Sequence, residues 1–277
     1  MRRLPRGYRA RRAEDTPVQD RTPPDRGPHA WRRPMSCFSS ADESAHYGFS
    51  VCMLLQQYRE QLRWEQEGVV ELGTGDAAAI AEVVRRLRGL RVRGFDISED
   101  SVDRARGNLA ALGVADRYTV ELGDFFDQAD ASGGPPVSTV IANPPYIPAP
   151  DSDILMPELW GGFYGNDLAL QLLKAGYENA VVAVPSYSDP GTTVTTATDL
   201  GYRVANFLAM GLDFGRYSSE PKVAAHIRRV CAEGRGWAGD GDYMVAVALF
   251  TRNPAVPGDR SRQLLSALHM AGEAAAS

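Results

Sequence analysis

The pattern of apolar and polar positions divides most of the chain into alternating strands and helices. Short aliphatic and β-branched runs predict strands, and apolar residues spaced three and four apart predict helices. Such alternation with short connections is typical of a mostly parallel, doubly wound α/β sheet. The predicted strands are Val69–Leu72, Val92–Asp96, Tyr118–Leu122, Val137–Ala142, Ala180–Pro185, Tyr202–Met210 and Tyr243–Thr251. The predicted helices between them are Ala77–Leu87, Glu99–Leu112, Asn166–Ala175 and one after Pro190.

Segments outside this alternation set the domain boundaries. Ser40 and Glu43 have the spacing of a capping box, and a helical apolar pattern follows them as far as Leu62. Val223 and Ile227 belong to a further amphipathic helix inside the insert between the last two strands. We divide the chain into a disordered basic arm (1–34), a helical lid (35–67), a central domain (68–252) and a loosely attached C-terminal tail (253–277).

Charge is distributed unevenly along the 277 residues. The net charge of −5 divides into +6 for residues 1–34 and −11 for the remainder. Ten arginines and six prolines in the arm predict disorder, and Met35 is the expected start of the folded part and an alternative translation start to Met1. An acidic body repels a phosphate backbone, so we expect no nucleic-acid partner.

Composition narrows the cellular setting. The chain is 44% hydrophobic and 23% charged, as in an ordinary soluble globular protein. No apolar run approaches the ~20 residues that a membrane helix needs. The three cysteines have neither metal-ligand spacing nor a disulfide framework. We expect a cytoplasmic protein without a membrane or metal partner, and we leave its oligomeric state open, a homodimer included.

Acidic and glycine-containing turns follow three successive predicted strands. The first is Glu71-Leu72-Gly73-Thr74-Gly75-Asp76, whose glycines let the backbone approach a ligand closely. Asp96 and Ile97 end the second strand, about twenty residues on, where an acid can bind ribose hydroxyls. Gly123-Asp124-Phe125-Phe126 ends the third strand and suits adenine. Each turn alone has a structural explanation, but three at one sheet edge favour a nucleotide-like ligand.

This series resembles the S-adenosylmethionine (SAM) site of class I methyltransferases. The resemblance implies a Rossmann-like, mostly parallel seven-stranded sheet with an N-terminal helical lid, and makes residues 68–252 the SAM-binding catalytic domain. NAD is the lesser alternative, because Ala78 stands where a dinucleotide fingerprint needs a third glycine. The resemblance implies Glu71 at the methionine amino group, Gly73 and Gly75 under the methionine portion, Asp96 at the ribose, and Asp124 and Phe125 at adenine. Thr74, Ile97 and Asn143 complete the expected cofactor-binding residues.

The fourth predicted strand ends in Asn143-Pro144-Pro145-Tyr146. Proline fixes the backbone, so the Pro144 carbonyl points in one direction, and Asn143 adds a side-chain carbonyl beside it. Two aligned acceptors suit a nitrogen with two N–H donors. Tyr146 can cover a flat substrate or face a sulfonium. We therefore predict Asn143, Pro144 and Tyr146 as catalytic residues, although an isolated Asn-Pro-Pro sequence is usually only a turn.

The Asn-Pro-Pro-Tyr motif resembles that of nitrogen-directed class I methyltransferases, including the release-factor glutamine N5-methyltransferases. Leu159–Asn166 is also similar to the Gly-Gly segment of that group. The segment Met35–Glu67 is short for the helical domain with which those enzymes dock a release factor. The expected function is therefore N-methylation of an amino or amide group of a small metabolite, with SAM as the cofactor.

Three alternatives stay open. One is a protein glutamine N5-methyltransferase. Another is an enzyme that closes SAM on itself to azetidine-2-carboxylate and methylthioadenosine. The third is a SAM-binding scaffold without catalysis, which the intact motif at Asn143–Tyr146 disfavours. We also leave open whether His46, Tyr47, Tyr187 and Ser188 contact the substrate.

Overall fold

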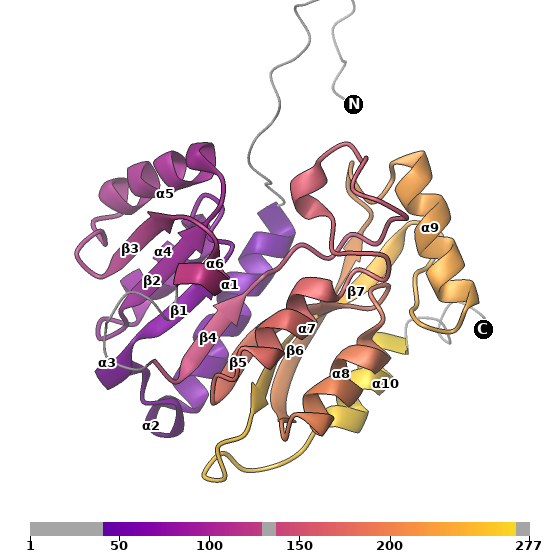
Figure 1. Cartoon of the computed structure of the whole chain (residues 1–277). Helices are drawn as coiled ribbons and strands as arrows, with labels where there is room; N and C mark the ends of the chain where they lie inside the picture. Colours follow the sequence, from indigo (N-terminus) through magenta and orange to yellow (C-terminus); the bar gives the residue numbers. More distant parts are fainter. Residues whose placement is uncertain (1–40, 129–136, 270–277) are drawn as a thin grey trace, which may run out of the picture. The chain divides into compact units, whose positions relative to one another are not determined.

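A computed structural model of the chain describes residues 41–128 and 137–269 (Figure 1). Within these ranges a seven-stranded sheet is flanked by helices on both faces. The strands are β1 (Val69–Leu72), β2 (Val92–Asp96), β3 (Tyr118–Leu122), β4 (Thr139–Ala142), β5 (Asn179–Pro185), β6 (Arg203–Asp213) and β7 (Asp242–Thr251). The helices are α1 (Ala41–Gln57), α2 (Arg59–Leu62), α3 (Trp64–Glu67), α4 (Ala78–Arg86), α5 (Glu99–Ala111), α6 (Phe125–Gln128), α7 (Asp167–Lys174), α8 (Pro190–Asp199), α9 (Pro221–Ala232), α10 (Ser261–His269) and the 3-10 helix η1 (Pro157–Leu159).

The strand order is β3-β2-β1-β4-β5-β7-β6. Strands β1 to β5 run parallel, and β7 is antiparallel to both β5 and β6. The chain reverses its direction of travel across the sheet between β3 and β4, on either side of β1. Ligands bind at such switch points in open α/β sheets. The expected Rossmann-like, mostly parallel seven-stranded sheet is confirmed.

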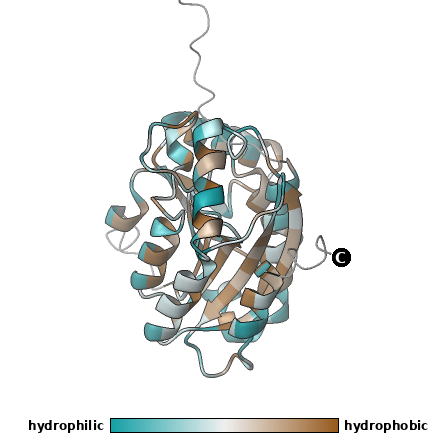
Figure 2. Cartoon of the chain, turned by 90° about the vertical axis from the view of Figure 1, so that its right-hand side faces the viewer, coloured by the Kyte–Doolittle hydropathy of each residue, from teal (hydrophilic) through white to brown (hydrophobic). Residues whose placement is uncertain are grey.

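Two apolar layers hold the helices to the sheet. Residues of alternating strand positions, such as Val69 and Val92, pack against α1, α4, α5 and α9 on one face. Their neighbours, such as Val70 and Val140, pack against α7, α8 and α10 on the other. Figure 2 shows the apolar strands between helices whose outer surfaces are hydrophilic. The continuous apolar runs in the strands follow from burial on both faces.

Helix α1 lies against α4, β6 and β7, and its residues Val51, Leu54 and Leu55 are fully buried. This packing places the start of α1 beside the carboxyl end of β4. Ser40 of the expected capping box lies outside the described residues. The Glu43 carboxylate of that box accepts a hydrogen bond from the Asn143 side chain 2.8 Å away.

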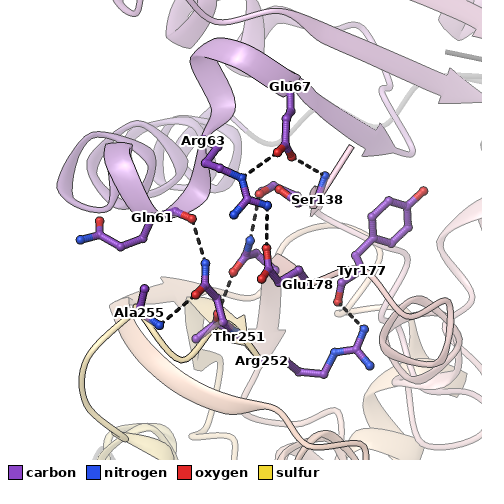
Figure 3. A network of polar contacts seen from close by, with 12 residues as sticks. Gln61, Arg63, Glu67, Ser138, Tyr177, Glu178, Thr251, Arg252 and Ala255 are labelled. Carbon is purple, nitrogen blue, oxygen red and sulfur yellow. Dashed lines mark hydrogen bonds and ion pairs between the residues drawn. The ribbon is translucent and has the colours of Figure 1, made fainter. Parts of the chain in front are cut away.

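A polar network ties the N-terminal helices to the opposite edge of the sheet, at the amino ends of β4 and β5 (Figure 3). Arg63 donates to Glu67 at 2.7 Å and to Glu178 at 3.1 Å. The side-chain amide of Asn253 donates to the Gln61 carbonyl at 3.0 Å. The N-terminal helices thus cover the amino ends of these strands and leave the carboxyl ends of the parallel strands open to a ligand.

Two segments differ from expectation. Strand β6 runs to Asp213, beyond the predicted end at Met210, because it pairs with β7 over its full length. The C-terminal segment is not loosely attached as far as His269, since Leu264 and Leu268 of α10 are fully buried against the sheet. The basic arm (1–34) lies outside the described residues. Among those described, no helix is long and apolar enough to cross a membrane.

Candidate functional site

A cavity of about 450 Å³ opens at the carboxyl ends of β1 to β4. Its size lies within the ~300–1,000 Å³ usual for small-molecule sites. The structure brings all the site residues predicted from the sequence to its wall, although their roles remain predictions. They are Glu71, Gly73, Thr74, Gly75, Asp96, Ile97, Asp124, Phe125, Asn143, Pro144 and Tyr146.

The charge of the cavity wall has one sign. Carboxyl groups come from β1 and the turn after it, from the end of β2, from the turn after β3, from α1 and η1, and from the end of β6. Among the described residues that line it there is no lysine, arginine or histidine. Such a wall attracts cations and repels phosphate groups. It suits a sulfonium nucleoside and disfavours the pyrophosphate of a dinucleotide.

The turn after β1 needs glycine for its backbone conformation. Gly73 and Gly75 have φ of +71° and +59°, in the left-handed region that favours glycine. A Cβ added at either position would meet no other protein atom within 4 Å. The space above the turn is therefore open for a ligand to approach the backbone. The Gly75 amide also donates to Asp96 Oδ2 at 2.8 Å, which joins this turn to the end of β2.

Asp96 is held with its carboxylate between two turns. Its Oδ1 accepts from the Ser98 amide at 2.9 Å, while Oδ2 accepts from Gly75. Burial raises the pKa of Asp96, and these two hydrogen bonds oppose the rise. Each oxygen retains a lone pair for a ribose hydroxyl. The neighbouring Ile97 is 71% exposed and presents an apolar side chain at the cavity rim.

Phe125 has a structural role beside its predicted one. Its ring is buried and meets the Phe95 ring edge-on, with the centroids 5.7 Å apart. Phe126, which the sequence analysis did not select, is only partly buried and also lines the cavity. Its amide donates to Asp124 Oδ1 at 2.8 Å and so fixes the acid. The two consecutive aromatic residues were the feature of the sequence that could have indicated both roles, with the Phe125 ring in the core and the Phe126 ring facing the ligand.

Glu71, in β1, is the most deeply buried carboxyl of the cavity wall, with 3% of its surface exposed. The Tyr118 hydroxyl of β3 donates to its Oε2. Burial raises the pKa of Glu71 to about 8, the Tyr118 hydrogen bond opposes this, and the charge of Asp96 adds to the rise. A cationic ligand group would favour the ionised form of this carboxyl.

Asn143 directly follows β4, and the two ends of its side-chain amide have different surroundings. Its Nδ2 donates to Oε1 of Glu43, which is 4% exposed. Its Oδ1 is buried, and within the described part of the chain no group donates to it. Burial raises the pKa of Glu43, while hydrogen bonds with Asn143, Tyr146 and Tyr243 oppose the rise. A buried acceptor without a donor is what a ligand N–H would satisfy.

Three tyrosine rings form a cluster in the same cavity. Tyr146 and Tyr187 meet with centroids 6.0 Å apart, and Tyr187 and Tyr243 with centroids 4.8 Å apart. The hydroxyls of Tyr146 and Tyr243 are 3.3 Å apart. All three tyrosines line the cavity. Sequence reasoning missed Tyr243 because it begins the last strand, about a hundred positions after the motif that it contacts.

The segment similar to the Gly-Gly region braces the Asn-Pro-Pro-Tyr turn. The Ile147 amide donates to the Leu159 carbonyl and the Gly161 amide donates to the Ile147 carbonyl, both at 3.0 Å. A Cβ on Gly161 would lie 2.6 Å from Tyr146 Cα. Glycine at this position therefore allows the two backbones to lie in contact, and the contact keeps the turn in place.

The residues whose contacts were left open divide into two pairs. Tyr47 and Tyr187 line the cavity. Ser188 does not, and its hydroxyl donates to the Tyr146 carbonyl at 2.9 Å. His46 is also absent from the wall and is buried on α1.

Comparison with known proteins gives partial matches. No protein-family model matches the chain. It is 35% identical over 127 residues to a release factor glutamine methyltransferase of Chlorobaculum tepidum, covering 44% of this chain and 42% of that protein. A protein of the same name from Bradyrhizobium diazoefficiens is 31% identical over 135 residues, covering 49% and 43%. The chain thus spans less than half of these relatives' lengths.

The fold has a solved counterpart. A putative RNA methyltransferase from Pyrococcus horikoshii superposes with a TM-score of 0.50 at 15% identity, covering 78% of this chain and 86% of that one. At this level of identity the likeness concerns the fold alone. The chain has the Rossmann-like fold of the class I methyltransferases.

Proposed function

We propose that the chain is a SAM-dependent N-methyltransferase. One observation carries the proposal: a single cavity, lined by acidic but no basic side chains among the described residues, joins the glycine turn after β1 to the buried, unpaired Oδ1 of Asn143. The first end suits a cationic sulfonium nucleoside. The second suits a nitrogen that carries hydrogen.

The residues present fit SAM. The open space over Gly73 and Gly75 can receive the methionine portion, with Glu71 near its amino group. The free lone pairs of Asp96 can accept from ribose hydroxyls, and Phe126 with Ile97 can cover adenine. SAM, when bound, supplies a methyl group activated by its sulfonium.

The end of the cavity at Asn143, which we call the acceptor end, contributes mainly by positioning the target nitrogen. Asn143 Oδ1 and the Pro144 carbonyl accept the two hydrogens of the target nitrogen, so its lone pair is directed to the methyl carbon. Tyr146 packs against the target group. Orientation of this kind can lower a barrier by about 7–11 kcal/mol without a strong base. The nitrogen then carries the methyl group and a surplus proton, which passes to solvent.

A glutamine side chain of a protein is our proposed acceptor, in place of the small metabolite expected from the sequence. Support comes from the relatives, which carry the name release factor glutamine methyltransferase. A primary amide presents two N–H donors, which match the two acceptors at Asn143 and Pro144. The acidic wall also favours this neutral acceptor over a nucleic acid.

The test combines binding with turnover. Calorimetry measures SAM binding to the full chain, and mass spectrometry follows methylation of a recombinant bacterial release factor. We expect one added methyl group on a glutamine, with S-adenosylhomocysteine as the second product. Asn143→Ala should abolish methylation and keep SAM binding, whereas Asn206→Ala, away from the cavity, should change neither.

Each arm can overturn a part of the proposal. No SAM binding would remove the cofactor assignment. Methylthioadenosine formed from SAM without any acceptor would replace methyl transfer with the SAM-cyclising alternative. Methylation of a small amine in a metabolite mixture, with the release factor unmodified, would restore the metabolite expectation.

A further inference from the structure

Glu43 contributes to the acceptor end of the cavity from a helix that belongs to none of the recognised motifs. It lies a hundred positions before Asn143 in the chain, yet its Oε1 is 2.8 Å from Asn143 Nδ2. It lines the cavity and is 4% exposed. A carboxyl this deeply buried requires hydrogen-bond partners that offset its lost hydration. The Asn143 side-chain amide is one of them, and the hydroxyls of Tyr146 and Tyr243 are the others.

The orientation of the Asn143 side chain decides what the cavity offers a target nitrogen. A carboxamide has nearly the same shape when its oxygen and nitrogen exchange places. With Oδ1 toward the target, the target N–H finds an acceptor. With Nδ2 toward the target, two donors face each other and no hydrogen bond forms. β4 and the two prolines after it fix the backbone but leave this choice open.

An ionised carboxylate removes the ambiguity, because it accepts hydrogen bonds and cannot donate one. Glu43 therefore holds Nδ2 on the α1 side, and Oδ1 is left without a donor. The buried residues Val51, Leu54 and Leu55 fix α1 to the body of the protein. The carboxylate is thus held in place by packing as well as by its own hydrogen bond.

We propose that Glu43 is a positioning residue, which orients the Asn143 carboxamide so that Oδ1 receives the target nitrogen. The proposal rests on the proposed N-methyltransferase function. A hydrogen bond to a charged group favours one orientation by roughly 10- to 100-fold. Loss of Glu43 should reduce turnover by a similar factor while SAM binding is kept.

The first experiment needs neither SAM nor an acceptor. In a ¹⁵N spectrum of the full chain, the side-chain NH₂ pair of Asn143 is assigned by its absence in Asn143→Ala. We expect this pair to exchange slowly with water in the wild type and in Glu43→Gln, whose amide oxygen can still accept. Fast exchange and a shifted resonance are expected in Glu43→Ala. Glu43→Met repeats the test with similar volume and no acceptor.

The second experiment measures kcat, KM and SAM affinity with a bacterial release factor as acceptor. Glu43→Ala and Glu43→Met should lower kcat by roughly 10- to 100-fold with SAM affinity within about twofold of the wild type. Glu43→Gln, whose amide can accept from Asn143 Nδ2 but can also donate to Oδ1, should give a kcat between those of these variants and the wild type. The same substitutions at the exposed Glu60 of α2 are the matched control and should change neither quantity.

The outcomes separate the two proposals. An Asn143 NH₂ pair that is unchanged in Glu43→Ala and Glu43→Met overturns the positioning role, whatever the acceptor. A kcat that stays at the wild-type value in Glu43→Ala and Glu43→Met also overturns it, because the Asn143 carboxamide would then be oriented without Glu43. If the NH₂ pair responds as expected but no release factor is methylated, the orientation holds and the acceptor assignment fails.

Discussion

Replacing Glu71 with glutamine is expected to make the protein without ligand more stable at neutral pH. The carboxyl is 3% exposed, and burial raises its pKa from 4.5 to about 8. In the unfolded chain the group ionises near pH 4.5, whereas in the folded chain it keeps its proton to higher pH. The contribution of Glu71 to stability is therefore greatest below pH 4.5 and falls as the pH rises toward about 8.

The size of the effect follows from the two pKa values. Each pH unit between them changes the free energy of unfolding by about 1.4 kcal/mol. The pKa of this carboxyl is 4.5 in the unfolded chain and about 8 in the folded chain. At pH 7 the wild type has therefore lost about 3 kcal/mol of its free energy of unfolding relative to pH 4.5 and below. Glutamine does not titrate and can still accept from Tyr118, so Glu71→Gln should recover most of this amount.

Urea unfolding across the pH range is the suitable assay. The difference in stability between Glu71→Gln and wild type should grow from pH 5 toward pH 8 and then stay constant. Glu60→Gln, at an exposed glutamate of α2, is the control and should follow the wild type. A difference that does not change with pH would refute the reasoning, since it would show that Glu71 is ionised in the fold throughout.

SAM binding should respond in the opposite direction. If Glu71 faces the methionine amino group, its ionised form is the one that binds. Glu71→Gln should then weaken SAM binding by about tenfold or more, although the protein itself is more stable. In the wild type, affinity should rise between about pH 6 and about pH 8. Equal SAM affinity in the two proteins would remove Glu71 from the ligand site.

Three further substitutions test separate parts of the structure. Asp96→Ala should raise the Kd for SAM by about tenfold or more in calorimetry, through loss of the ribose acceptor; an unchanged Kd would refute that role. Gly161→Ala should destabilise the protein by about 1–3 kcal/mol and slow turnover, because its Cβ lies 2.6 Å from Tyr146 Cα; wild-type melting would show that the turn adapts. Leu264→Ala should cost about 2–5 kcal/mol in urea unfolding; no loss would mean that α10 is not part of the core.

Most of the fold could be predicted because the sheet is buried on both faces. Its strands are then continuous apolar runs, which stand out against polar turns, and β1, β2 and β3 begin and end as predicted. The extension of β6 to Asp213 could not be read from the sequence. It depends on pairing with β7, and its outer half alternates between half-buried and exposed positions.

The part of the cavity formed by strand ends could likewise be anticipated, because the carboxyl ends of parallel strands meet at one edge. The part contributed by α1 and β7 could not. Glu43 has the local spacing of a helix-cap residue, and only tertiary packing brings it to Asn143. Tyr243 is one of several aromatics near a strand end, and nothing local distinguishes it. Leu264 and Leu268 lie among small and polar residues, whose composition hides two fully buried positions.

The place of β7 in the sheet has a consequence for how the chain reaches its native state. This strand, the last along the described sequence, lies between β5 and β6, and in the described sheet β6 pairs with β7 alone. During synthesis β6 has no neighbour to pair with until residues 242–251 have emerged. Strands β1 to β5 can assemble earlier, since each pairs with another of that group. We therefore expect late, rate-limiting insertion of β7, with an early intermediate that already holds the glycine turn but lacks Tyr243 and the contacts of α1 with β6 and β7.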